Sequence, residues 1–179
     1  MSTYSRRDFL QTTAKGGVSA WALSQLGMRA DAQTRPNIVL IVSDDQGWGD
    51  VGYHGADIET PNIDQLVRDG VELDRFYSFP ICSPTRVALM TGRSPNRMGV
   101  SIPIEPGRPK PPLDEHFMPQ SFQEAGYQTW IFGKWHLGGD AEGEEAYRPN
   151  QRGFEYAYGF DSGFIDYYTH IHREMHDLH

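Results

Sequence analysis

A short apolar run near the start of the chain, Ile38-Val39-Leu40-Ile41-Val42, limits the folds that this sequence can adopt. A continuous run rich in Ile and Val predicts a strand that is buried on both faces, as in a parallel sheet. The run is far shorter than the roughly 20 apolar residues that a membrane-spanning helix needs, so we expect no stable membrane insertion. A parallel sheet requires helices on its faces, so this run favours the α/β class.

The rest of the chain supports this class, because segments of helical and strand character alternate along it. Each expected helix begins with a proline in its first turn and ends before a glycine, which are typical start and stop signals. We predict an α/β fold with a mostly parallel sheet flanked by helices. The expected helices span residues 61–69, 83–91 and 119–125, the further strands span 71–76 and 127–132, and a Pro-rich surface loop spans 101–112.

The first residues have the character of an export signal. Ser5-Arg6-Arg7-Asp8-Phe9-Leu10 precedes a weakly apolar stretch, and Ala30-Asp31-Ala32 has the small-x-small pattern of a cleavage site. This order is typical of a bacterial twin-arginine signal peptide; the alternative is an amphipathic helix. We therefore assign residues 1–32 to a signal and residues 33–179 to one domain. The signal predicts a periplasmic or secreted protein with the Tat export machinery as a partner.

Composition excludes two classes of protein. The 179 residues carry a formal net charge of −8, which disfavours nucleic-acid binding because that function needs a basic face. The single cysteine excludes an internal disulfide framework. The lone thiol is then either a filler of the core or a chemical group.

Two of the expected strands lead into charged residues. Asp44 and Asp45 follow the first strand, while Lys134 and His136 follow the strand at 127–132. In open α/β sheets ligands bind beyond the carboxyl ends of the strands, so we expect these groups at one sheet edge. Adjacent carboxylates suit a Ca²⁺ or Mg²⁺ ion, whereas Lys134 offers fixed positive charge and His136 can move protons. The alternatives are a solvated acidic turn, a salt-bridged lysine and a hydrogen-bonded histidine.

A third candidate is the segment Cys82-Ser83-Pro84-Thr85-Arg86 at the expected start of a helix. A helix N-terminus presents free N–H groups and a positive dipole end, which favour an anion and lower the pKa of a thiol. Arg86 lies one turn along and can bind an oxyanion beside Cys82. The alternative is a buried and inert cysteine, and the residues alone leave both interpretations open.

Cys82-x-Pro84-x-Arg86 resembles the sulfatase signature, in which the cysteine is converted to formylglycine. Further segments resemble sulfatase segments in the sulfatase order, and together they cover essentially Arg35 to the end of the chain. They are Arg35-Pro36-Asn37, Asp44-Asp45-Gln46-Gly47-Trp48-Gly49-Asp50, Thr60-Pro61-Asn62-Ile63-Asp64, Leu89-Met90-Thr91-Gly92-Arg93, Gly133-Lys134-Trp135-His136-Leu137-Gly138 and Arg152-Gly153-Phe154. Asp114-Glu115 and Asp166-Tyr167-Tyr168 are similar to the arylsulfatase B type, which acts on sulfated sugars.

The resemblance implies a role for each of these positions. Asp44 and Asp45 would be calcium ligands, and Cys82, as hydrated formylglycine, would be the nucleophile and a further metal neighbour. Arg86 would steady the formylglycine, Lys134 would bind sulfate oxygens, and His136 would hydrogen-bond the diol and help to expel sulfate. The implied partners are a sulfated carbohydrate or aryl sulfate ester and a formylglycine-generating enzyme.

The resemblance also sets an expectation about extent. In sulfatases an Asp-Asn pair, a second histidine and another lysine come from later segments, and no Asp-Asn dipeptide occurs in this sequence. We therefore interpret the chain as the N-terminal part of a longer sulfatase, inactive by itself. Two other functions stay open. One is a phosphonate or phosphate ester hydrolase of the same superfamily, and the other is an inactive glycan-binding module.

Overall fold

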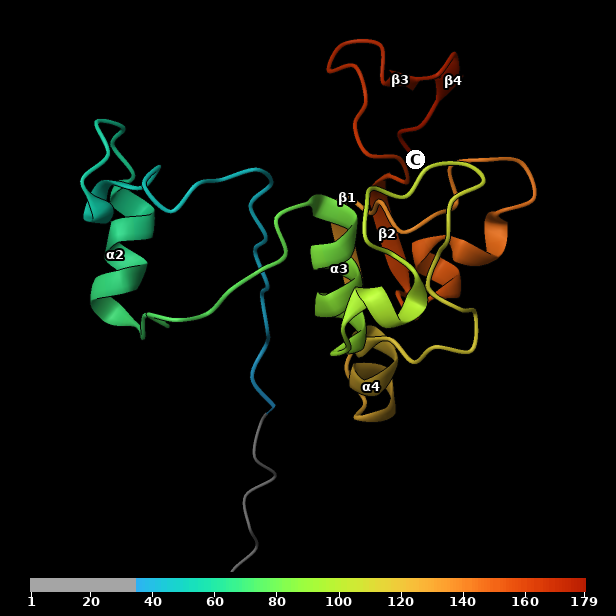
Figure 1. Ribbon diagram of the computed structural model, residues 1–179. Helices are drawn as coiled ribbons and strands as arrows, with labels where there is room; N and C mark the ends of the chain where they lie inside the picture. Colours follow the sequence, from blue (N-terminus) through green and yellow to red (C-terminus); the bar gives the residue numbers. More distant parts are fainter. Residues whose placement is uncertain (1–34) are drawn as a thin grey trace, which may run out of the picture. The chain divides into compact units, whose positions relative to one another are not determined.

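The computed structural model describes residues 35–179 (Figure 1). The predicted signal peptide, residues 1–32, lies outside the described residues. The chain divides into two units, one ending at Val42 and the other spanning Ser43–His179. No helix in the described part of the chain has both the length and the apolar character needed to cross a membrane.

The apolar run at residues 38–42 does not form the predicted buried strand. It has no assigned secondary structure, and Val39 and Ile41 are 82% and 81% exposed. A strand of a parallel sheet is stabilised by hydrogen-bonded neighbours and by layers on both faces. The described residues of its own unit, 35–42, contain no second strand that could supply them.

A parallel pair of strands is present in the second unit, as the predicted fold class requires, although the sequence did not predict a strand at residues 156–160. Strand β1 (Trp130–Lys134) pairs in parallel with β2 (Tyr156–Phe160), in a register that places Trp130 opposite Tyr156 and Lys134 opposite Phe160. The connection between them contains the short 3-10 helices η3 (Glu145–Tyr147) and η4 (Pro149–Gln151). Both strands therefore end on the same side of the sheet, and the segments that leave this edge build the site described below.

The helices begin and end close to where their prolines and glycines predict. They are α2 (Pro61–Asp69), α3 (Cys82–Thr91) and α4 (Met118–Glu124), and Gly92 ends α3 with a left-handed φ of 65°. Two further 3-10 helices are η1 (Gly52–His54) and η2 (Pro95–Met98). The predicted strand at residues 71–76 is wrong, because this segment is irregular and exposed. The Pro-rich segment 101–112 is a loop, as predicted.

The core lies between α3, the Pro-rich loop and the segments that flank the two strands. Trp135 and Phe117 are its largest members, with 2% and 1% of their surface exposed, and their rings are 6.0 Å apart. Because Trp135 follows β1 directly, the core fixes the end of that strand. The remaining members are Val87, Val100, Ile104, Leu137 and Phe154.

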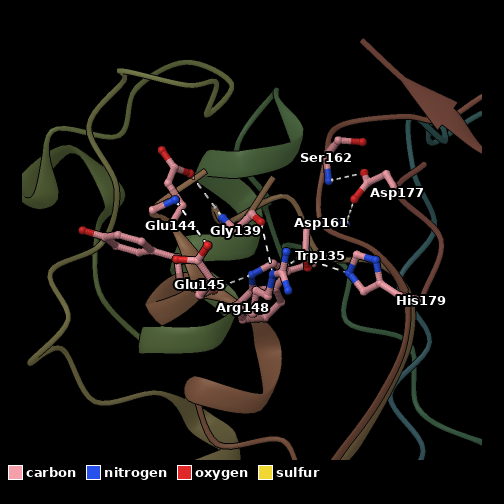
Figure 2. A network of polar contacts seen from close by, with 11 residues as sticks. Trp135, Gly139, Glu144, Glu145, Arg148, Asp161, Ser162, Asp177 and His179 are labelled. Carbon is pink, nitrogen blue, oxygen red and sulfur yellow. Dashed lines mark hydrogen bonds and ion pairs between the residues drawn. The ribbon is translucent and has the colours of Figure 1, made fainter. Parts of the chain in front are cut away.

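The last residues form a small hairpin of β3 (Ile171–His172) and β4 (Met175–His176), and they return to the end of β2. There the carboxylate of Asp177 accepts hydrogen bonds from the backbone N–H groups of Asp161 and Ser162 (Figure 2). The buried carboxylate of Asp161 in turn contacts Arg148 and His179. These bonds hold the last residues of the described chain and Arg148 against the residues that follow β2.

Candidate active site

The single thiol of the chain lies at the beginning of α3. Cys82 is the first residue of the helix, directly after the extended residue Ile81, and its side chain is half-buried and free. Pro84 in the first turn fixes a helical backbone and needs no hydrogen-bond acceptor, which explains why the helix begins here. The thiol therefore sits at the positive end of the helix dipole, as the sequence predicts.

Arg86 connects this helix to the end of β1. Its guanidinium donates a hydrogen bond from Nη1 to the backbone carbonyl of Lys134. Burial lowers the pKa of Arg86 below its ordinary range, and the charges of Asp44 and Cys82 oppose that shift. Arginine stays charged under these conditions, so a fixed positive charge lies beside the start of α3.

Lys134 connects the end of β1 to the acidic pair. Its Nζ lies 2.7 Å from Oδ2 of Asp44, and its side chain is 12% exposed. The ion pair joins residues that are 90 positions apart, so Asp44 lies next to the end of β1. Asp45 has a left-handed φ of 52° and an exposed side chain, and within residues 35–179 it shows no ion pair with these cations.

His136 is the most constrained member of the site. Only 6% of its surface is exposed, and its φ of 59° is rare for a residue other than glycine. Its Nε2 lies 3.1 Å from the carbonyl oxygen of Ile104, and a carbonyl only accepts, so Nε2 carries the hydrogen. In the described part of the chain, Nδ1 is the buried side-chain polar atom without a hydrogen-bond partner.

The surroundings of His136 keep it neutral. Burial and the positive charges of Lys134 and Arg86 lower the pKa of His136 from 6.5 to about 4, against smaller opposing effects of the Ile104 hydrogen bond and Asp44. At neutral pH the ring therefore has a lone pair on Nδ1 and can accept a proton there. A strained backbone and a displaced pKa in one buried histidine are typical of a functional site.

Two residues that support His136 were not among the sequence candidates. The hydroxyl of Ser83 donates to the backbone carbonyl of His136, and Gly163 lies against the imidazole, where an added Cβ would be 2.8 Å from Cε1 and Nε2. Neither contact has a local signal in the sequence, although Ser83 stands between the two singled-out residues Cys82 and Pro84. Four of the predicted residues, Asp44, Arg86, Lys134 and His136, are thus assembled around the start of α3.

The sequence also matches a known protein family. The family model described as Sulfatase matches residues 36–177, which is most of the chain. The chain belongs to the sulfatase family. This result confirms the resemblance of the ordered motifs.

Two relatives illustrate the extent of the sulfatase similarity. Arylsulfatase J of Mus musculus is 41% identical over 157 residues, which cover 82% of this chain and 25% of that protein. N-acetylgalactosamine-6-sulfatase of Rattus norvegicus is 41% identical over 149 residues, which cover 76% of this chain and 28% of that protein. The chain therefore spans about a quarter of the length of these curated sulfatases.

Solved structures confirm the fold class. The crystal structure of Ps i-CgsB superposes with a TM-score of 0.67 at 41% identity, covering 75% of this chain and 30% of that one. The structure of Ps i-CgsB in complex with k-i-k-neocarrahexaose gives a TM-score of 0.62 at 36% identity, and the match covers 78% of this chain and 31% of that one. The sulfatase chain described here thus shares the α/β fold of these proteins over the matched region.

Proposed function

We propose that this protein takes part in the hydrolysis of sulfuric esters, with Cys82 as the precursor of a formylglycine nucleophile. The observation that carries the proposal is the junction of α3 with the end of β1, where Arg86 binds the carbonyl of Lys134 and Lys134 binds Asp44. This junction places two cations and a neutral histidine next to the start of the helix that bears Cys82. Membership of the sulfatase family supports the same activity.

The two cations match the charge of the substrate. A sulfate ester is anionic and a poor electrophile, and its negative charge is redistributed as the sulfur is attacked. Arg86, held in place by its bond to Lys134, offers a forked donor that can contact two oxygens. Lys134 offers a single ammonium group, which can bind a further sulfate oxygen. We assign charge stabilisation to these two residues.

Asp44 and Asp45 suit a calcium ion by the chemistry of their donors, because both are carboxylates, which Ca²⁺ prefers. In the described residues Asp44 is paired with the Lys134 ammonium, and the ligand atoms of Asp44, Asp45 and Cys82 are not gathered into one cluster. We propose that Asp44, Asp45 and the modified Cys82 hold the ion, with Mg²⁺ as the less favoured choice. If Asp44 served as a ligand, the Lys134 ammonium would be free to bind the substrate. A calcium ion held by these residues would supply electrostatic stabilisation of the sulfate oxygens.

His136 is a neutral imidazole with an unprotonated Nδ1, as a proton acceptor requires. Hydrated formylglycine supplies one hydroxyl that attacks sulfur while the alcohol leaves, and a second hydroxyl whose collapse to the aldehyde expels sulfate. We assign the uptake of the proton from that second hydroxyl to Nδ1 of His136. The hydrogen bond from Nε2 to Ile104 keeps Nδ1 unprotonated, and burial keeps the ring neutral.

The family and the sequence support a proposal for the substrate, the maturation partner and the location. We propose a sulfated carbohydrate or an aryl sulfate as substrate, of the arylsulfatase B type, and a formylglycine-generating enzyme as partner. One similar structure is a complex with k-i-k-neocarrahexaose, which supports a carbohydrate substrate. The twin-arginine motif supports Tat export to the periplasm or the medium.

The test compares ester classes on the full-length gene product, made together with a formylglycine-generating enzyme. We expect hydrolysis of an aryl sulfate, loss of activity in both Cys82→Ala and Cys82→Ser, and loss on chelation of calcium. Cys82→Ser is the matched control. Serine provides a hydroxyl group, but it lacks the thiol that a formylglycine-generating enzyme converts to the aldehyde. Faster hydrolysis of an aryl phosphonate would favour the phosphonate alternative. Unchanged activity in Cys82→Ala would refute the assignment of the nucleophile.

A further inference from the structure

The hydroxyl of Ser83 joins three segments that are distant in the sequence. Its Oγ donates to the backbone carbonyl of His136 at 3.1 Å and accepts from the backbone N–H of Ile104 at 2.9 Å. Ile104 completes a closed ring, because its own carbonyl accepts the hydrogen bond from Nε2 of His136 at 3.1 Å. One side chain thus binds the backbone of His136 and the residue that orients its imidazole.

This ring of bonds is sealed from water. Ser83 is fully buried, Ile104 is 2% exposed and His136 is 6% exposed. A buried backbone donor or acceptor that loses its partner is not rescued by solvent, so both groups depend on the Ser83 hydroxyl. Because Ser83 is the residue after Cys82 in the first turn of α3, the same bonds fix the imidazole relative to the start of that helix.

The backbone of His136 needs such support. Its φ of 59° lies in the left-handed region, which an L-residue adopts only when the surrounding structure imposes it. The carbonyl is held by Ser83, the N–H donates to the carbonyl of Asp161 at 3.0 Å, and Gly163 lies against the ring. Among these contacts, the bond to Ser83 is the one that comes from α3.

We propose that Ser83 is a positioning residue, which sets the orientation and tautomer of His136 relative to the nucleophile at Cys82 through its two hydrogen bonds. The inference rests on the proposed sulfatase function for its effect on catalysis, but the placement of the ring can be measured without any substrate. The substitution Ser83→Ala removes both bonds and changes the volume of the side chain little. Ser83→Thr keeps the hydroxyl and serves as the conservative variant.

Thr129 provides a matched control outside the site. It is 7% exposed, and its Oγ1 donates to the carbonyl of Gly153 at 2.7 Å and accepts from the N–H of Glu155 at 3.3 Å. Thr129→Val therefore deletes a buried hydroxyl that bridges two backbone segments, as Ser83→Ala does, but does not touch His136. An effect common to both variants reports general loss of stability, and an effect confined to Ser83→Ala reports positioning.

The experiment combines ¹⁵N NMR of the histidine rings with steady-state kinetics on the full-length gene product. In the wild-type protein at neutral pH we expect His136 to carry its proton on Nε2, and this measurement needs no variant to fold. In Ser83→Ala we expect a mixture of tautomers and a kcat that is lower by roughly 100-fold, with little change in KM, as for a displaced catalytic group. Ser83→Thr should restore most of kcat, and Thr129→Val should change neither the tautomer nor kcat.

The outcomes separate this inference from the proposed function. A wild-type His136 that is protonated on Nδ1, or an unchanged tautomer in a folded Ser83→Ala, would overturn the role of Ser83 whether or not the protein hydrolyses sulfate esters. Equal losses of kcat in Ser83→Ala and Thr129→Val would also overturn it. If no sulfate ester is hydrolysed by the wild type but the tautomer changes only in Ser83→Ala, the positioning of His136 stands and the proposed function fails.

Discussion

The low pKa of His136 makes the stability of the protein depend on pH in a defined direction. The pKa is about 4 in the folded state against 6.5 for an ordinary histidine, so the unfolded state takes up the proton first as the pH falls. The unfolded state therefore binds more protons between these two values, and the free energy of unfolding decreases as the pH falls through this window. The full difference amounts to about 3 kcal/mol, and about 2 kcal/mol of it is lost between pH 7 and pH 5.

Urea denaturation of the wild type and of His136→Gln at these two pH values isolates the effect. Glutamine has no titratable group, so the carboxylates of the protein contribute equally to both proteins and cancel in the comparison. We expect the wild type to lose about 2 kcal/mol more than the variant between pH 7 and pH 5. The same loss in both proteins, or an NMR titration of His136 near pH 6.5, would refute the reasoning from burial and from the charges of Lys134 and Arg86.

Three further predictions follow from individual contacts. Gly163→Ala places a Cβ 2.8 Å from the His136 ring, so we expect a displaced imidazole in ¹⁵N NMR spectra and a lower kcat, and an unchanged ring signal would contradict the packing. Arg152→Met removes the three hydrogen bonds that the buried guanidinium donates to carbonyls of residues 112–115, so urea denaturation should show a loss of about 3 kcal/mol, and a loss below about 1 kcal/mol would contradict it. Chelation of calcium should abolish sulfate release in a way that added Ca²⁺ restores, and activity that survives chelation would refute the role of Asp44 and Asp45.

Local chemistry explains which elements the sequence could predict. Proline at the start and glycine at the end determine where a helix can begin and stop, so α2 and α3 lie within a residue of their predicted ends. The strand before Lys134 was predicted too early in the chain, since β1 begins at Trp130 rather than Tyr127. The first and last residues of a strand depend on its hydrogen bonds to a partner strand, here β2. No local sequence signal comparable to proline or glycine marks these ends.

Tertiary context explains what could not be predicted. The runs at 38–42 and 71–76 have the composition of strands, but no strand is assigned to either of them, because pairing and burial rather than composition make a strand. The catalytic candidates were found from their residue types and order, and the structure brings Asp44, Arg86, Lys134 and His136 together. The supporting role of Ser83 could not be predicted, because Ser83 and His136 are 53 positions apart in the sequence and only the fold brings them into contact.

The chemical state of the Cys82 side chain shows directly whether Cys82 is the precursor of a formylglycine nucleophile. The measurement is mass spectrometry of the peptide that contains Cys82, from protein made with and without a formylglycine-generating enzyme. We expect the aldehyde in the first sample and the thiol in the second. A thiol alone in both samples would contradict a formylglycine nucleophile at the start of α3.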